Sequence, residues 1–242
     1  MLKGKTILIT GSSRGIGAAT ARLAKEYGAT VILHGQTDSK HIAILANELG
    51  SKFYVCDVAD KPAVDTVVAR AIEDYGKIDA LINCAGMTNR ARFMDSTDDL
   101  WLEIFKVNVL GTVHFCQAVI PHMQKARYGR VVNVASIRAH GVTSGRPAYS
   151  AAKAGIMNLT ATLAKEFAPD ILVNAVSPGF TQTDMSKTWD EAVWKQVNSA
   201  LLGRVGQPKE IAQMLLFLAS DRATFITGQT FLVDGGYSIS GK

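Results

Sequence analysis

A tyrosine and a lysine four positions apart, Tyr149 and Lys153, are the residues of this sequence whose types and spacing most directly suggest chemistry. Residues at this spacing lie on one face of a helix. A free phenol has a pKa of about 10, and a neighbouring ammonium favours the phenolate and lowers that pKa towards neutrality. Tyr149 is therefore a candidate proton donor and acceptor. The same spacing also occurs on solvated helices without any function, so the hypothesis depends on partners elsewhere in the chain.

A glycine-rich turn follows the first apolar run, with the sequence Thr10-Gly11-Ser12-Ser13-Arg14-Gly15-Ile16-Gly17. Glycines let the backbone turn tightly and approach a pyrophosphate, which then lies on the amides at the positive end of the following helix. The spacing Gly-x-x-x-Gly-x-Gly differs from the commonest dinucleotide fingerprint, and a tight structural turn is the alternative interpretation. Its position between the first strand and the first helix favours phosphate binding.

Polar residues recur where the later strands are expected to end. They are Asp57, Asn83 with Ala85 and Gly86, Ser136, and Pro178 with Gly179. Each could be an ordinary loop or cap residue. Because the carboxyl ends of parallel strands share one edge of a sheet, the set as a whole indicates a ligand site at that edge.

Short β-branched runs alternate with longer segments of helical period along the chain. The predicted strands are Thr6–Thr10, Thr30–His34, Phe53–Cys56, Ala80–Asn83, Arg130–Val134, Ile171–Ala175 and Thr230–Val233. The predicted helices are Ile16–Tyr27, Ser39–Leu49, a segment capped by Asp60 that runs to Tyr75, Asp98–Lys125, Ala148–Phe167 and Pro208–Ala219. We expect an α/β fold in one domain, residues 1–242, with a doubly wound (Rossmann-type) seven-stranded parallel sheet and helices on both faces.

Composition narrows the class of protein. The chain has 242 residues, 48% of them hydrophobic, and a formal net charge of +5, which suits an anionic cofactor or substrate. It has no concentrated basic run or nucleic-acid motif, so we expect no nucleic-acid partner. Cys56, Cys84 and Cys116 form no Cys-x-x-Cys pair, so we expect core thiols rather than disulfides or a metal site. No apolar run approaches the ~18 residues that span a bilayer, and we expect a cytoplasmic protein.

The ordered motifs resemble those of the short-chain dehydrogenase/reductase family from end to end. They are Thr10-Gly-x-x-x-Gly-Ile-Gly17, Asp57-Val58, Asn83-Cys-Ala-Gly86, Asn108, Ser136, Tyr149-x-x-x-Lys153, Pro178-Gly179 and Asp234-Gly-Gly236. The resemblance implies that Tyr149 is the general acid in carbonyl reduction and that Lys153 lowers its pKa and binds the nicotinamide ribose. It implies further that Ser136 holds the substrate oxygen and that Asn108 holds a water joining Lys153 to solvent. Taken alone, Asn108 could be a helix-packing amide.

The resemblance also implies a set of cofactor contacts and no metal. The implied cofactor-binding residues are Gly11, Ser13, Arg14, Gly15, Ile16, Gly17, Gln36, Asp57, Val58, Asn83, Ala85, Gly86, Tyr149, Lys153, Pro178, Gly179 and Thr181. Cys84 stands where a second asparagine is frequent in the family. It is either a weakly reactive thiol near the cofactor or, as we expect, a buried structural cysteine.

The end of the second strand bears on the choice of cofactor. Members that prefer NAD carry an acid there, which binds the ribose hydroxyls and repels a 2′-phosphate. This chain has Gly35 at that position, followed by Gln36 and Thr37, while Arg14 could bind the phosphate through its guanidinium. We therefore expect NADP (NADPH), with NAD as the less favoured alternative.

The substrate should be set by the variable segments Met87–Asp95 and Ile137–Arg146 and by a flap at about 180–205. Gly179-Phe-Thr-Gln-Thr-Asp-Met185, Leu202-Gly-Arg-Val-Gly206 and Thr227-Gly-Gln-Thr230 are similar to the 3-oxoacyl-[acyl-carrier-protein] reductase branch. Several arginines on or near the flanking loops could serve an acidic carrier, a phosphopantetheine arm or a small carboxylate: Arg90, Arg92, Arg127, Arg130, Arg138 and Arg146.

Other functions stay open. Asp170 stands near where the carrier-protein branch presents a basic residue, which weakens that assignment. A dehydrogenase acting on a sugar, polyol, keto-acid or other secondary alcohol would keep the same catalytic residues. A non-catalytic nucleotide-binding protein would be expected to have lost Tyr149 or Lys153, and both are present.

Two helical segments predict assembly. Ala148–Phe167 and Asp98–Lys125 carry more apolar and small residues than one sheet face can cover, so a partner subunit is implied. In the family these helices pair across a two-fold axis, and the C-terminal region, here Ile226 to Ser240, forms a second two-fold contact. We expect a homotetramer. The alternative is that Lys and Arg side chains shield these faces in a monomer.

Overall fold

A computed structural model describes residues 1–141, 144–184, 186 and 189–240. Its centre is a seven-stranded sheet in which every neighbouring pair is parallel, in the order β3-β2-β1-β4-β5-β6-β7. The strands are β1 Thr6–Thr10, β2 Thr30–Gly35, β3 Phe53–Val55, β4 Ala80–Asn83, β5 Gly129–Val134, β6 Ile171–Pro178 and β7 Thr230–Val233. The order reverses between β1 and β4, which makes the carboxyl ends of these two strands the expected ligand site of a doubly wound sheet.

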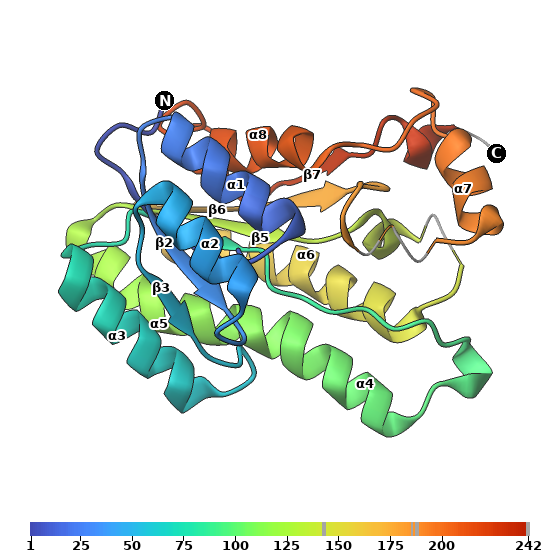
Figure 1. Ribbon diagram of the computed structural model, residues 1–242, viewed down its shortest axis with the longest axis horizontal. Helices are drawn as coiled ribbons and strands as arrows, with labels where there is room; N and C mark the ends of the chain where they lie inside the picture. Colours follow the sequence, from blue (N-terminus) through green and yellow to red (C-terminus); the bar gives the residue numbers. More distant parts are fainter. Residues whose placement is uncertain (142–143, 185, 187–188, 241–242) are drawn as a thin grey trace.

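Helices cover both faces of the sheet (Figure 1). One face carries α1 Gly15–Glu26, α2 Lys40–Leu49 and α8 Pro208–Leu218, and the other carries α3 Lys61–Tyr75, α4 Asp98–Phe105, α5 Gly111–Ala126 and α6 Pro147–Phe167. Successive strand residues point to opposite faces. Ile7 and Ile9 therefore lie in the core under α1 and α8, while Leu8 lies in the core under α3 and α5. The predicted fold class is confirmed.

The predicted helix Asp98–Lys125 is not regular. It consists of α4, a π-helical turn η2 at Lys106–Leu110, and α5. A π turn contains one residue more than an α turn would, and such turns concentrate at functional sites. Its apolar period continues that of the flanking helices, so the sequence pattern did not reveal it.

Some elements were absent from the prediction. Helix α7, Glu191–Asn198, lies inside the predicted flap and is capped by Asp190, whose side chain accepts a hydrogen bond from the Val193 amide at 3.0 Å. Short 3-10 turns occur at η1 Phe93–Asp95, η3 Ile137–His140 and η5 Tyr237–Ile239. All of these elements are at most eight residues long, which is too short for a clear helical period.

Strand β6 is longer than predicted, since it runs to Pro178 rather than Ala175. The polar side chains of Asn174 and Ser177 are both buried and paired. Asn174 bridges the main chain of Ile226 and Gln229, and the Ser177 hydroxyl lies 3.0 Å from His140 Nε2. These bonds let β6 extend into the edge of the sheet where the site lies.

The continuous helical path Asp98–Ala126 has the length and composition of a membrane span, with a mean hydropathy of 1.3 over its most apolar window. The sequence analysis anticipated no such segment. Of that window, 44% is buried inside the protein. The apolar side chains of α5, including Phe115 and Val119, pack against the sheet, which is how a core helix of a globular domain behaves.

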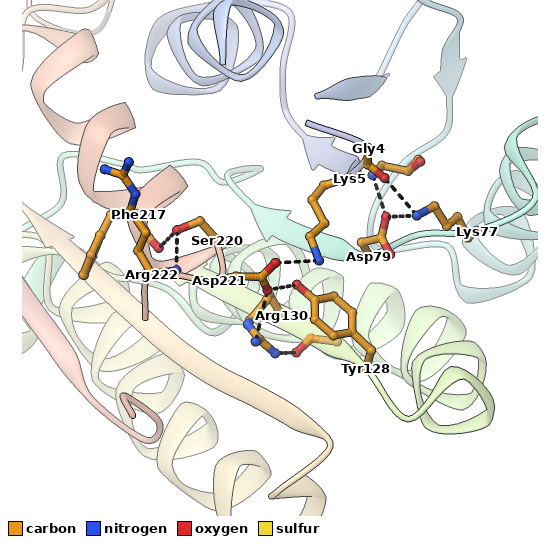
Figure 2. Close-up of polar contacts among 12 residues, drawn as sticks. Gly4, Lys5, Lys77, Asp79, Tyr128, Arg130, Phe217, Ser220, Asp221 and Arg222 are labelled. Atoms are coloured by element: carbon orange, nitrogen blue, oxygen red, sulfur yellow. Dashed lines mark hydrogen bonds and ion pairs between the residues drawn. The ribbon is translucent and has the colours of Figure 1, made fainter. Parts of the chain in front are cut away.

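Charged side chains from separate parts of the chain form a cluster at the amino ends of the strands (Figure 2). Asp221 forms ion pairs with Lys5 at 2.9 Å and Arg130 at 3.6 Å, and it accepts a hydrogen bond from the Tyr128 hydroxyl at 2.7 Å. Lys5 and Arg130 also lie over the Tyr128 ring. The expectation that Arg127 and Arg130 flank the functional site was wrong. Both lie at the amino ends of the strands, whereas the site lies at the carboxyl ends, and Arg127 pairs there with Asp170.

His34 of β2 is a buried imidazole. Its Nε2 lies 3.3 Å from the Cys56 thiol sulfur, its ring meets Phe115 edge-on, and its Nδ1 has no hydrogen-bond partner among the described residues. Burial disfavours the charged form and lowers the pKa of His34 to about 4. The folded chain therefore holds this imidazole neutral.

Acid should destabilise the fold through His34. In the unfolded chain the imidazole binds a proton below its ordinary pKa of about 6.5, whereas the folded chain does not bind it until about pH 4. The free energy of unfolding should therefore decrease as the pH falls from 6.5 to 4, by about 3 kcal/mol from this residue. Urea unfolding at several pH values should show a shallower decrease in His34→Gln. An identical slope in the variant would remove His34 as the cause.

Candidate active site

The glycine turn and the segment after β4 pack against each other at the point where the strand order reverses. The Ala85 amide donates to Thr10 Oγ1 at 3.1 Å. A Cβ atom on Gly11 would lie 2.8 Å from Ala85 Cα, and one on Gly17 would lie 2.3 Å from the Gly11 carbonyl oxygen. Backbone contacts this close leave no room for a side chain, so the cradle is built from main chain alone.

The first turn of α1 fits a phosphate group. It contains no acidic residue, and the preceding Arg14 makes no side-chain cap, so the helix dipole and free amides face outward. Arg14 is exposed beside this turn. In the flap, Thr183 Cγ2 lies 3.4 Å from the position that a Cβ on Gly15 would take. The first residues of the flap therefore lie next to the glycine turn.

A second group of predicted residues closes the ends of β2 and β3. Gln36 Nε2 donates to Asp57 Oδ2 at 3.3 Å, and Asp57 Oδ1 accepts from the Ala59 amide at 2.9 Å. A Cβ on Gly35 would lie 2.9 Å from Ile42 Cδ1, so Ile42 occupies the space beside this glycine. Val58 is buried against Gly111 of α5. No carboxylate stands at residue 35.

Tyr149, Ser136 and Lys153 come together on the same edge. Tyr149 and Lys153 lie on α6, and Ser136 directly precedes η3. The Ser136 hydroxyl lies near enough to the Tyr149 phenol to lower its pKa. Lys153 Nζ lies 5.8 Å from the Tyr149 ring centroid and donates to the Val134 carbonyl oxygen at 2.7 Å. The helical spacing of the pair is thus as predicted.

The electrostatics of this group differ from the prediction. Burial raises the pKa of Tyr149, although the Ser136 hydroxyl and the charges of Arg138 and Arg146 oppose that shift. The sequence analysis expected the Lys153 ammonium to lower the pKa of Tyr149, and that expectation was wrong for this arrangement. Burial also lowers the pKa of Lys153, to about 8. The phenol is therefore held in its protonated form at neutral pH.

Asn108 lies in the π turn η2 and is fully buried. Its Nδ2 donates to the carbonyl oxygens of Met87 at 2.9 Å and Ile104 at 3.0 Å. Its Oδ1 has no hydrogen-bond partner within the described part of the chain. A Cβ on Gly86 would lie 2.8 Å from this oxygen and 3.5 Å from Lys153 Nζ. The amide nitrogen therefore serves packing, while the free acceptor lies next to Lys153, where a water or a ligand hydroxyl would satisfy it.

The carboxyl end of β6 leads into the flap. A Cβ on Gly179 would lie 2.6 Å from Asp234 Cα, so the Pro178-Gly179 turn packs on the Asp234-Gly-Gly236 turn. Thr181 Oγ1 donates to the Gly179 carbonyl oxygen at 3.0 Å, and Thr181 bridges to Gly206. Met185, at the end of the motif predicted here, and residues 187–188 of the flap lie outside the described residues. Asn83, by contrast, is a buried residue that donates to Asn133 Oδ1 at 2.9 Å.

An aromatic cluster between the flap and the C-terminal turn escaped the sequence analysis. Phe180 meets Trp189 and Tyr237 edge-on, and Trp189 meets Trp194 in the same way. No spacing rule could have paired residues so far apart in the chain. Cys84 is partly buried rather than fully buried, and burial raises the pKa of its thiol to about 12, which disfavours a reactive thiolate.

No group of three or more His, Cys, Asp or Glu side chains arranged to hold a metal ion occurs among the residues that the structure describes. The side chains that converge on the edge of the sheet are instead a phenol, a hydroxyl, an ammonium and an amide. Together with the main-chain cradle beside them, they can bind a dinucleotide, hold a carbonyl oxygen and move a proton.

Comparison with known proteins places this geometry in context. Residues 11–238 match the family model described as enoyl-(acyl carrier protein) reductase. A curated relative, the 3-oxoacyl-[acyl-carrier-protein] reductase FabG of Thermotoga maritima, is 40% identical over 98% of this chain and 99% of its own length. The FabG of Haemophilus influenzae is 38% identical over 99% of this chain and 100% of its own length.

Solved structures show the same fold. The crystal structure of gox2181 has a TM-score of 0.93 and 31% identity, and the match covers 98% of this chain and 97% of that chain. A crystal structure named ribose-5-phosphate isomerase from Brucella melitensis 16M has a TM-score of 0.91 and 37% identity, with coverage of 98% and 93%. That name and the reductase name describe different reactions, so likeness of fold does not choose the substrate.

Proposed function

Because the chain belongs to the short-chain dehydrogenase/reductase family, and is thus an NAD(P)-dependent oxidoreductase acting on CH–OH or C=O groups, we propose that it reduces a 3-oxoacyl thioester to the 3-hydroxyacyl thioester with NADPH. Its curated relatives are named for reduction of a 3-oxoacyl group carried on an acyl-carrier protein. The observation that carries the proposal is the partly buried Tyr149 phenol, which lies on the same edge of the sheet as Ser136, Lys153 and the main-chain cradle. Thioesters of this class include both those carried on an acyl-carrier protein and free ones.

The proposed reduction gives a role to each of four residues: Ser136, Tyr149, Lys153 and Asn108. When bound, the cofactor supplies the hydride that adds to the carbonyl carbon. Ser136 and Tyr149 hold the carbonyl oxygen, and Tyr149 donates its proton to that oxygen as the C–O bond becomes single. The raised pKa of Tyr149 keeps the proton in place until then. Lys153 would supply the replacement proton, and the unpartnered Asn108 oxygen beside it would hold a water that joins Lys153 to solvent.

A substrate panel tests this function. We expect acetoacetyl thioesters to be reduced with the highest kcat/KM when they are compared with keto-acids and keto-sugars in the presence of NADPH. A clear preference for a keto-sugar, or fast oxidation of a polyol, would favour the second candidate, a dehydrogenase of sugars or other secondary alcohols. Absence of turnover on the whole panel would favour a non-catalytic nucleotide-binding protein.

The preference for NADPH rests on two features of the cradle. Residue 35 offers no carboxylate to repel a 2′-phosphate, and Arg14 is exposed next to the first turn of α1. Gln36 is paired with Asp57, so Arg14 is the cation that would meet the phosphate.

Arg14→Ala should narrow the preference for NADPH over NADH. We expect the unmodified protein to use NADPH at least several-fold better by kcat/KM, and the variant to lose about tenfold with NADPH and little with NADH. Arg22→Ala is the matched control, because Arg22 is an exposed arginine of the same helix that pairs with Glu48. Equal efficiency with both cofactors in the unmodified protein contradicts the assignment.

We further propose a homotetramer. Leu102 and Leu110 are exposed on the helical path that includes α4 and η2, while Ile239 in the C-terminal region and Phe225 directly before it are also exposed. Two separate apolar surfaces suit two different two-fold contacts. Size exclusion with light scattering should give about four times the chain mass of 26.0 kDa. Twice that mass would leave one contact, and a monomer at micromolar concentration would exclude both.

A further inference from the structure

Two arginines, Arg138 and Arg146, come two or three residues from Ser136 and Tyr149 in the chain. Arg138 follows Ser136 in η3, and its amide donates to Ser136 Oγ at 3.2 Å. Arg146 directly precedes α6 and so comes three residues before Tyr149. Arg146 and Tyr149 line the same small cavity, and the charges of both arginines act on the Tyr149 phenol. They are therefore close enough to the expected position of the substrate carbonyl to influence what binds there.

Both guanidinium groups are held in place but keep free donors. Arg138 Nη1 donates to the Ser144 carbonyl oxygen at 2.9 Å and to that of Gly145 at 3.4 Å. Arg146 Nη1 donates to Thr88 Oγ1 at 3.1 Å. A guanidinium has five N–H donors, and within the described ranges the side-chain bonds of each arginine are made by this one nitrogen. The remaining N–H groups can bind a ligand.

The local charge balance is positive. Arg138 and Arg146 are half-buried, and burial lowers the pKa of both, with further lowering from Arg90 for each and from Arg138 for Arg146. Among the described residues, the carboxylate that counters this effect at Arg146 is that of Asp190, which forms an ion pair with Arg90 at 3.1 Å. None of the acids in the described part of the chain does so at Arg138. Partly buried cations without their own carboxylate favour an anionic ligand.

The backbone conformation of Arg146 is strained, which indicates a functional constraint on this residue. Arg146 has φ 56° and ψ 50°, the left-handed conformation, which costs a residue other than glycine about 1 kcal/mol. Its amide donates to the Ala91 carbonyl oxygen at 3.3 Å, so the segment after β4 holds this conformation. The guanidinium is thereby directed towards Thr88, on the segment that follows Gly86.

We propose that Arg138 and Arg146 bind an anionic oxygen group of the ketone substrate, a carboxylate or a phosphate, beside the carbonyl held by Ser136 and Tyr149. This inference rests on the proposed ketone reduction and narrows its substrate class. The carboxylate of a small keto-acid and the phosphate of a phosphopantetheine arm share this chemistry. Planar guanidinium groups bind both kinds of anion through paired N–H donors.

Binding to the complex of the protein with its oxidised cofactor tests the proposal, because a ketone cannot be reduced in that complex. Calorimetry would compare acetoacetate with methyl acetoacetate, which lacks the charge. It would also compare acetoacetyl-phosphopantetheine with acetoacetyl-N-acetylcysteamine, which lacks the phosphate. We expect the charged member of at least one pair to bind about tenfold more tightly or better. The pair that shows this difference identifies the carboxylate or the phosphate as the source.

Arg138→Gln and Arg146→Gln should each remove most of that difference. The Kd of the charged ligand should rise about tenfold, while the Kd of its neutral counterpart should change less than about threefold. Arg222→Gln is the matched control, since Arg222 is an exposed arginine at the opposite edge of the sheet. Circular dichroism and cofactor affinity report whether each variant is folded. If Arg138→Gln does not fold, the Kd values of Arg146→Gln alone test the proposal.

Two results would overturn the proposal. One is a wild-type protein that binds charged and neutral ligands equally, and the other is a variant that loses affinity for both to the same extent. Failure of the proposed function is distinguishable from either. Charge-selective binding without turnover of any ketone would contradict the reduction and leave the anion site standing, whereas turnover without charge selectivity would contradict the anion site alone.

Discussion

Tyr149→Phe is expected to lower kcat for ketone reduction by about a hundred- to ten-thousandfold, the usual contribution of a positioned general acid. Phenylalanine keeps the partly buried ring, which packs against the cluster of Ile104, Ala148 and Ala152, and removes only the hydroxyl. Without that proton the alkoxide that forms on the substrate must take one from water. Single-turnover measurements with NADPH would report the chemical step directly.

The affinity of Tyr149→Phe for the cofactor shows whether the variant has lost only its proton donor or has also lost its structure. The Kd of NADPH for Tyr149→Phe should stay within about threefold of wild type, because the variant leaves the main-chain cradle intact. Tyr27→Phe, at the end of α1 and remote from Ser136, should retain full activity. Turnover near the wild-type rate in Tyr149→Phe would exclude this tyrosine as the proton donor.

Gly17→Ala is expected to weaken cofactor binding at least about a hundredfold, which corresponds to about 3 kcal/mol. The new Cβ would lie 2.3 Å from the Gly11 carbonyl oxygen and 2.9 Å from Ser12 Cα. Both neighbours are main chain, so relief requires the glycine turn itself to move, and such overpacking is destabilising. Moving the turn also displaces the amides that face the phosphates.

Gly155→Ala provides the comparison for that variant. Gly155 is in the interior of α6, where a Cβ would meet no atom within 4 Å. Its cofactor affinity should match wild type, since the same chemical change is made away from the cradle. Titration of NADPH by protein fluorescence would measure both. A Gly17→Ala protein that binds NADPH normally would show that the turn does not hold the phosphates.

Much of the fold follows from local patterns in the sequence. Continuous apolar runs such as Thr6–Thr10 are typical of strands buried on both faces, and the structure places helices over both faces of β1. The Asp60 cap is a second case, because its side chain accepts from the Ala63 amide as the pattern indicated. These features depend on residues near one another in the chain.

The failed expectations depend on three-dimensional placement. Arg130 and Arg138 are close in sequence, yet β5 separates them, and a strand advances about 3.3 Å per residue. Arg130 therefore pairs with Asp221 at one edge of the sheet, while Arg138 lies beside Tyr149 at the other. The pKa of Tyr149 is a similar case, since its burial arises from several elements that the spacing to Lys153 does not describe.

The π turn at Lys106–Leu110 makes the position of Asn108 in the site sensitive to one-residue insertions and deletions. Each residue of an α-helix turns the chain by about 100°. Deleting one residue here, which would restore a regular helix, would take Asn108 out of its place beside Lys153 or rotate Phe115 and Val119 of α5 away from the sheet. A one-residue length change that most surface loops tolerate should therefore be excluded at this position, because it would damage core and site together.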